Sequence, residues 1–233
     1  MEDKIIFLED ALLIEDILVM SDLHIGNDDF LEESIFEKLE KLFEFLGRKK
    51  LKVRKIVVLG DLKDRFGEIN DTEWRGVIRL IDFFMKKVDK ENIIIIKGNH
   101  DSVLKPILDK RDIKLRDYYK YKNLVFIHGD KVSDKLKGSV IFIGHFHPTI
   151  TLKDNYKSER YKCFLRGSYK RSLIYILPSF NPIYTGFNLN DLSFEDKNNF
   201  SDLKEKNLKN FDVIIYNLKE RKALNFGKLK NIY

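Results

Sequence analysis

All five histidines of the chain follow short apolar runs, at the points where strands are expected to end. They are His24, His100, His128, His145 and His147. Asp22, Asp61 and Asn99 occupy the same kind of position, so carboxylate and amide groups accompany the imidazoles. In open α/β sheets the carboxyl ends of the strands form the edge where ligands bind. These residue types and positions therefore predict one polar site at a sheet edge.

The spacing of the aspartates and histidines suits divalent metal ions. Asp22 and His24 are two residues apart, so on an extended segment their side chains would point the same way and could bind one ion. His145 and His147 repeat this spacing, and we expect a turn to divide them between two ions.

Two further positions complete the predicted ligand set. Asp61 could bridge both ions through its two carboxylate oxygens, and Asn99 offers a neutral carbonyl oxygen. Mixed oxygen and nitrogen ligation without a thiolate favours manganese, iron or zinc over magnesium or calcium.

Each short pattern is weak evidence by itself. A single Asp-x-His or Gly-x-His is typical of an ordinary turn, and an Asp after Gly often caps a helix. Here polar clusters follow five predicted strands, at residues 22–24, 60–64, 98–101, 128 and 144–147. The ordered set predicts a two-metal phosphoesterase site centred on Asn99, His100 and Asp101.

Hydrophobic periodicity predicts the strands and helices that would position these residues. In the first half, strands are predicted at 5–8, 17–20, 55–59 and 93–96, and helices at 31–46 and 74–88. Further short strands, several expected to be antiparallel, are predicted at 124–127, 140–143, 161–165, 173–177, 213–216 and 223–226. The early alternation of strands and helices favours βαβ units and an α/β fold with a largely parallel sheet.

Length and composition restrict the classes of protein to which the chain could belong. With 233 residues, 43% of them hydrophobic, the chain is expected to form a single domain over 1–233, with a polar surface excursion around 188–210 and a short helix near 202–208. No apolar run is long enough to suggest a membrane span, and the acidic start is unlike a signal peptide, so cytoplasmic localisation is expected. The single cysteine, Cys163, excludes an internal disulfide and is expected to be a buried apolar filler.

The basic charge is concentrated after the last histidine. Residues 1–147 carry 27 Lys and Arg against 28 Asp and Glu, whereas residues 148–233 carry 16 against 9. The segment from Lys153 to Arg171 has seven basic and two acidic residues interleaved with aromatic ones. It could bind a nucleotide or nucleic acid beside the metals, or be a half-buried strand pair with its aromatic rings in the core.

The motif order resembles that of the calcineurin-like metallophosphoesterase superfamily. The residues that carry the resemblance are Asp22-x-His24, Gly60-Asp61-x-x-Asp64, Gly98-Asn99-His100-Asp101, His128 and Gly144-His145-x-His147. The compact length and the later Leu177-Pro178-Ser179-Phe180-Asn181-Pro182 are most similar to archaeal phosphoesterases related to SbcD-type nucleases. The resemblance implies two packed mixed β-sheets flanked by helices in a four-layer sandwich.

The resemblance also implies roles for individual residues. The first metal would be held by Asp22, His24, Asp61 and His147, and the second by Asp61, Asn99, His128 and His145. His100 would face the substrate phosphate, as a proton donor or a stabilising charge, with Asp101 orienting it. Asp64 would either support a ligand or form an ion pair with Lys63 or Arg65.

The expected function is hydrolysis of nucleotide, cyclic-nucleotide or short nucleic-acid phosphodiesters. Two divalent metal ions, with manganese expected and iron, zinc or nickel as alternatives, would bridge a hydroxide that attacks the phosphate in line. A phosphomonoesterase or protein phosphatase would use the same chemistry. A non-catalytic partner subunit of a nucleic-acid-processing complex is a further alternative, against which the complete ligand set argues.

Overall fold

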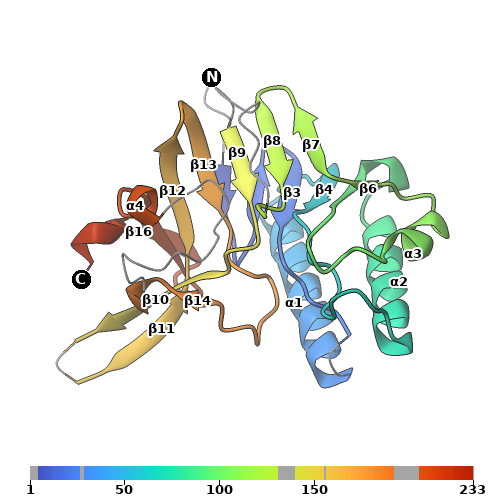
Figure 1. Cartoon of the computed structure of the whole chain (residues 1–233), viewed down its shortest axis with the longest axis horizontal. Coiled ribbons are helices and arrows are strands. Elements are labelled where there is room, and N and C mark those ends of the chain that lie inside the picture. The colour runs from blue at the N-terminus through green and yellow to red at the C-terminus, as the bar shows by residue number, and fades with distance from the viewer. Residues whose placement is uncertain (1–4, 27–28, 131–139, 155, 192–204, 233) are drawn as a thin grey trace.

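The protein is described by a computed structural model that covers residues 5–26, 29–130, 140–154, 156–191 and 205–232 (Figure 1). None of the helices in these ranges is long and apolar enough to cross a membrane. The first half of the chain contains strands β1 (Ile5–Phe7), β2 (Leu12–Ile14), β3 (Ile17–Met20), β4 (Lys55–Val58), β5 (Ile93–Ile96) and β6 (Leu115–Arg116). The helices of this half are α1 (Asp29–Arg48), α2 (Asp71–Met85), α3 (Lys105–Asp109) and the 3-10 turn η1 (Lys90–Asn92).

The second half is built almost entirely from strands. They are β7 (Tyr118–Tyr121), β8 (Leu124–Ile127), β9 (Val140–Ile143), β10 (Pro148–Lys153), β11 (Ser158–Lys162), β12 (Phe164–Tyr169), β13 (Ser172–Ile176), β14 (Phe187–Asn188), β15 (Asp212–Asn217) and β16 (Lys222–Lys228). Short helical segments are η3 (Leu189–Asp191), α4 (Glu205–Leu208) and η4 (Leu229–Asn231).

Two mixed sheets organise these strands. The first has the order β1-β2-β3-β4-β5-β6, in which β3 to β6 are parallel to one another and β2 is antiparallel to both of its neighbours, β1 and β3. The second has the order β16-β15-β12-β13-β9-β8-β7, in which β8, β9 and β13 are parallel. A separate small sheet has the order β11-β10-β14.

The two large sheets pack face to face through an apolar layer. Val19, Val57 and Ile94 from the first sheet meet Phe126 and Phe142 from the second. The rings of Phe126 and Phe142 stack at 5.2 Å, so the layer is filled by flat side chains. Because both sheets contribute alternate residues to this core, their strands are held in a fixed mutual position.

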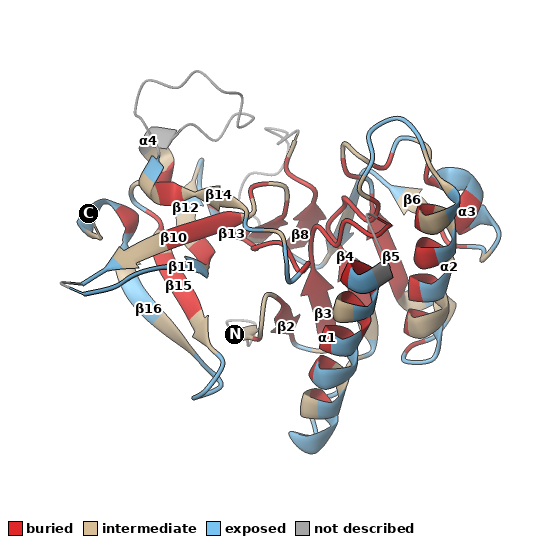
Figure 2. Ribbon diagram, turned by 90° about the horizontal axis from the view of Figure 1, so that it is seen from below, coloured by how far each residue is buried: buried red, intermediate tan, exposed pale blue. Residues whose placement is uncertain are grey.

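Different elements cover the outer faces of the sheets (Figure 2). Helices α1, α2 and α3 cover the first sheet, and α1 buries Leu31, Ile35 and Leu39 on one stripe because these residues recur at helical spacing. The second sheet is covered by Ile150 of β10, Leu208 of α4 and other short segments. The prediction of an α/β fold with two packed mixed sheets is confirmed, and the covering layer of the second sheet consists of short elements.

Several local predictions need correction. The predicted strand 161–165 is divided between β11 and β12, because the chain passes from the small sheet to the second large sheet at the buried Cys163. The expected antiparallel pairing holds for β12, β13, β15 and β16, but β13 pairs in parallel with β9. The predicted excursion at 188–210 begins with β14 and with Leu189 buried in the core, and residues 192–204 lie outside the described residues.

A cluster of charged residues links α1 and β11 to the segment 178–182. The Lys162 ammonium group donates to the carbonyl oxygens of Ser179 (2.8 Å) and Asn181, and lies 3.5 Å from the Asp10 carboxylate. Lys38 donates to Asp10 and to the carbonyl oxygen of Phe180. Burial lowers the pKa of Lys162 to about 8, although Asp10 opposes this. Lys162, which belongs to the predicted nucleic-acid segment, therefore supports the fold.

Replacing Lys162 by Met should lower the free energy of unfolding by about 1–3 kcal/mol, because two buried carbonyl oxygens lose their donor. The matched change Lys157→Met removes a cation whose side chain is 73% exposed, and should alter stability by less than about 0.5 kcal/mol. Urea unfolding of both variants measures the difference. Equal stability losses would contradict the supporting role of Lys162.

Candidate metal centre

The predicted site residues gather at one edge of the two packed sheets. Asp22 and His24 follow β3, Asp61 follows β4, and Asn99 follows β5 in the first sheet. In the second sheet, His128 follows β8, and His145 and His147 follow β9. These parallel strands all end at the same edge, so face-to-face packing of the sheets brings the two sets of side chains together.

Five of the seven predicted ligands have a left-handed backbone conformation. The φ angles of Asp22, His24, Asp61, His145 and His147 lie between 42° and 67°. This region is uncommon for residues with a Cβ atom and clusters at functional sites. The expected extended geometry at Asp22 and His24 is therefore wrong. The loop is instead fixed by backbone bonds to the β4 loop, including His24 N–H to the Asp61 carbonyl oxygen at 3.0 Å.

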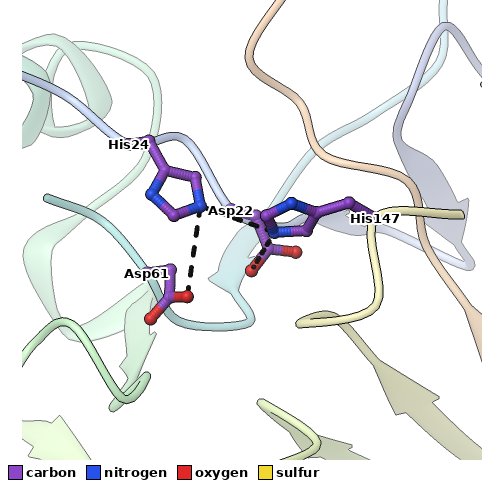
Figure 3. A group of neighbouring side chains, drawn as sticks. All are labelled: Asp22, His24, Asp61 and His147. Atoms are coloured by element: carbon purple, nitrogen blue, oxygen red, sulfur yellow. Dashed lines mark hydrogen bonds and ion pairs between the residues drawn. The ribbon is translucent and has the colours of Figure 1, made fainter. Parts of the chain in front are cut away.

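One group of side chains converges as Figure 3 shows. It contains Asp22, His24, Asp61 and His147, whose potential ligand atoms all lie within 4.8 Å of one another. His147 Nε2 is 3.3 Å from Asp22 Oδ1 and 3.4 Å from His24 Nε2. Asp22, His24 and Asp61 are almost completely buried. The two acidic groups and two imidazoles could hold one cation.

A second group shares Asp61 with the first. Asp61, His128 and His145 offer ligand atoms within 4.8 Å of one another. His128 Nε2 lies 2.8 Å from Asn99 Oδ1 and 3.0 Å from His145 Nδ1. His145 and His147 thus fall in different groups, as the expected turn between them requires.

The donor set fits a pair of divalent ions. The Nδ1–H of His128 donates to the Leu59 carbonyl oxygen at 2.7 Å, which leaves Nε2 unprotonated and directed toward Asn99 and Asp61. Such a bond to the second ring nitrogen is how proteins orient histidine ligands. Burial raises the pKa of Asp22, but the imidazole of His147, followed by those of His128 and His24, outweighs burial and keeps the pKa below its usual range. Asp22 is therefore a carboxylate, as a ligand must be.

Glycines allow the loops to approach one another at the site. A Cβ atom on Gly98 would collide with the Asp61 carboxylate, and a Cβ atom on Gly144 would collide with Ser21 and Asp22. The glycines of the Gly-Asn-His-Asp and Gly-His-x-His patterns are thus required by close packing around the two aspartates.

His100 lies beside both groups without joining either. Its Nδ1–H donates to the Asp64 carbonyl oxygen, and its Nε2 is 3.7 Å from Asp61 Oδ2. Burial lowers the pKa of His100, although the negative charge of Asp61 opposes this. The bond to Asp64 selects the tautomer and leaves Nε2 available to the reacting centre.

The structure corrects the role expected for Asp101. Its fully buried carboxylate accepts hydrogen bonds from the backbone N–H groups of Gly98 (2.9 Å) and Leu62 (3.0 Å), whereas the His100 ring bonds to Asp64. A buried carboxylate needs donors, and these amides supply them. Burial, followed by the Asp61 charge, raises the pKa of Asp101 to about 6. Asp101 therefore ties the β4 loop to the β5 loop.

Tyr184 is a site residue that the sequence patterns missed. Its ring stacks on the His24 ring at 4.4 Å, and its hydroxyl donates to Asp64 Oδ1 at 2.7 Å. Asp64 Oδ1 in turn is 3.4 Å from His24 Nδ1. Of the two readings of Asp64, support of a ligand is therefore the one the geometry favours. Tyr184 lies 37 residues after His147 without a motif of its own, so the sequence carried no signal for it.

The segment containing Ser179 and Asn181 supports the loop after β3. The Ser179 hydroxyl donates to the Asp22 carbonyl oxygen at 2.7 Å, and the Asn181 side-chain amide donates to the Leu23 carbonyl oxygen at 2.9 Å. Both side chains are buried. The Leu-Pro-Ser-Phe-Asn-Pro pattern thus has a physical role in fixing Asp22 and His24.

Comparison with known proteins identifies the family. The family model of calcineurin-like phosphoesterases matches residues 16–216, and the chain belongs to this family. The crystal structure of Pseudomonas putida nuclease MPE has a TM-score of 0.61 at 17% identity, covering 91% of this chain and 92% of that one. The E. coli phosphoesterase Yfce has a TM-score of 0.44 at 14% identity, with 91% and 98% covered. No curated protein matches the sequence significantly.

Replacing Gly98 by Ala should weaken metal binding by about 10–100-fold, because the added methyl group displaces the Asp61 carboxylate. Gly47→Ala is the matched control, since nothing lies within 4 Å of its Cβ position near the end of α1. Manganese titration followed by calorimetry measures the affinity of both variants. Wild-type affinity in Gly98→Ala would show that Asp61 is not constrained as described.

Proposed function

We propose that the protein is a two-metal phosphodiesterase that hydrolyses nucleotide or short nucleic-acid phosphodiesters. The observation that carries the proposal is the pair of donor groups that share Asp61. In this assignment Asp22, His24, Asp61 and His147 hold one ion, and Asp61, Asn99, His128 and His145 hold the other. Membership in the calcineurin-like phosphoesterase family supports a metal-dependent hydrolase.

The bound ions would polarise the phosphate and supply a nucleophilic hydroxide near neutral pH. Manganese is the proposed metal, with iron, zinc or nickel as alternatives, because carboxylate, amide and imidazole groups without sulfur suit such ions. The protein holds the ligand atoms in fixed positions. Its carboxylates are buried, carbonyl groups fix the histidine tautomers, and glycines let the loops pack closely. Nuclease MPE, which shares the fold, is consistent with a phosphodiester substrate.

His100 is proposed to act on the leaving group. Its Nδ1–H is held by the Asp64 carbonyl, so Nε2 is the atom that faces the centre beside Asp61. A protonated Nε2 would donate to the departing oxygen or stabilise negative charge on the phosphate in the transition state.

The segment from Lys153 to Arg171 remains a proposed nucleic-acid contact through its exposed cations. Lys162 and Arg166 are already engaged, Lys162 with backbone carbonyls and Asp10, and Arg166 with Asp212 at 3.1 Å. Arg160 also makes hydrogen bonds, to Thr149 Oγ1 and to the Gly186 carbonyl oxygen two residues from Tyr184, but it is exposed to solvent. The hydrogen bond from β11 to Gly186 supports the proposal, because it brings a positive charge next to the segment of Tyr184, whose ring stacks on His24.

Asp61→Ala should lose both metal ions and nearly all phosphodiesterase activity, because one carboxylate serves both donor groups. Asp109→Ala, which removes an exposed carboxylate on α3, should keep two ions and wild-type turnover. Elemental analysis of the purified variants and hydrolysis of bis-p-nitrophenyl phosphate provide the two readouts. Two bound ions with normal turnover in Asp61→Ala would exclude the assignment.

His100→Ala should retain both metals and slow hydrolysis by about 10²–10⁴-fold, the usual range for loss of a general acid. If His100 donates a proton, an alkyl leaving group should suffer more than a nitrophenyl leaving group. Turnover of paired nitrophenyl and methyl esters tests this. Equal losses would assign charge stabilisation to His100, and loss of metal would make it a ligand.

Replacing Lys153, Lys157 and Arg160 together by Gln should weaken binding of a short single-stranded oligonucleotide and reduce its salt dependence, because phosphate contacts release counterions. The control carries Lys49→Gln, Lys50→Gln and Lys52→Gln, three exposed cations beyond the far end of α1. Fluorescence anisotropy at several salt concentrations compares them. The same salt slope in both triple variants would remove the segment from the proposed interface.

A further inference from the structure

An exposed aromatic ring lies directly against His100. Phe66 is 64% exposed, yet its ring centroid is only 3.6 Å from that of His100, with 34° between the ring planes. One side of the phenyl ring therefore contacts the imidazole, while much of the ring remains open to solvent. A single exposed apolar side chain is ordinary on a protein surface, but Phe66 is set apart by its ring contact with His100 at the proposed centre.

The loop that carries Phe66 is anchored on both sides. The fully buried Glu73 carboxylate accepts from the backbone N–H groups of Arg65 (2.7 Å) and Asn70 (3.0 Å). The Lys63 ammonium group donates to the Arg65 carbonyl oxygen. Glu73 also forms the capping box of α2 with Asn70, so the loop is attached to a helix that packs on the first sheet. These contacts present the ring from a fixed backbone.

Phe66 is the outer member of a row of four rings. The His100 ring is 4.9 Å from the His24 ring, which stacks on Tyr184 at 4.4 Å. At the other end, Ile183 precedes Tyr184 and is 53% exposed. Two rings of the row, His24 and His100, belong to the proposed centre, and Phe66 adds an apolar ring beside the residue proposed to face the leaving group.

We infer that Phe66 is a stacking platform for an unpaired nucleobase on the leaving-group side of the scissile phosphodiester. This inference rests on the proposed function, in which His100 faces the leaving oxygen. Every nucleobase has a flat π face that stacks on an aromatic side chain, whereas a base within a duplex has both faces covered. The chemical class of substrate is therefore a nucleotide diester or single-stranded segment with a free base next to the phosphate.

A purely protective role for Phe66 would have different consequences. If the ring only holds or shields His100, its loss should slow every substrate, whatever group leaves. If it binds a base, its loss should act through KM and only on substrates that carry the base. The two roles are separated by comparing substrates that differ in that base alone.

The kinetic test uses two trinucleotides of thymidine, one of them with an abasic residue on the leaving-group side of the scissile bond. The manganese-loaded wild type should show a KM about tenfold or more lower for the complete trinucleotide, as aromatic–base stacking provides. Phe66→Leu should lose this preference, so that its KM values for the two trinucleotides become nearly equal, while Phe66→Trp should retain it. Phe226→Leu, an exposed aromatic change on β16, is the matched control.

A binding readout without turnover uses the fluorescence of Phe66→Trp, with the wild-type signal of Trp74 as baseline. Stacking predicts quenching by the complete trinucleotide and much weaker quenching by the abasic one. Equal quenching, an absent base preference in the wild type, or equal losses on both trinucleotides in Phe66→Leu would overturn the inference. If no phosphoester is hydrolysed with metal bound, the proposed function fails and the inference fails with it.

Discussion

Face-to-face packing of two sheets is the constraint on which the centre depends. The apolar layer between them fixes the strand ends of β3, β4 and β5 opposite those of β8 and β9. The stacked rings of Phe126, Phe142 and Tyr175 hold this layer from the second sheet. Polar residues appear where the strands stop, so the relative position of the sheets sets the distance between the two halves of the ligand set.

The residues around the centre have backbone angles and buried charges that are unfavourable by themselves. Asp22, Asp61 and His145 have positive φ angles, and Asp22 and Asp61 are almost fully buried with other ionisable groups around them. Such features cost stability and persist only where the surroundings determine them. Here the surroundings are the amides that bind Asp101 and the polar side chains of Ser179 and Asn181. In the proposed function, bound cations would offset the remaining repulsion between carboxylates.

The fold class and the convergence of the predicted ligands could be inferred from the sequence because both depend on short-range signals. Runs such as Ile93–Ile96 predict buried strands, and a His or Asp after each run marks the same sheet edge. The ligand roles themselves stay proposals. Residues that act through long-range contacts were not predictable: Tyr184 reaches His24 only through folding, and Lys162 is half-buried although its neighbours along β11 are exposed.

The misassigned role of Asp101 has the same origin. Adjacency in sequence suggested that Asp101 orients His100, but a turn directs the carboxylate to the amides of Gly98 and Leu62 while the imidazole meets Asp64. Likewise, the alternation around Cys163 predicted one strand because periodicity does not reveal that the chain changes sheets there. Local patterns therefore located the site, and tertiary contacts determined how its residues are supported.

The most direct test of the central claim is a crystal structure of the manganese-loaded protein with anomalous scattering recorded for the metal. The account predicts two peaks about 3.5–4 Å apart, both in contact with Asp61, one beside Asp22 and His147 and the other beside His128 and His145. A single peak, or manganese bound away from Asp61, would contradict it.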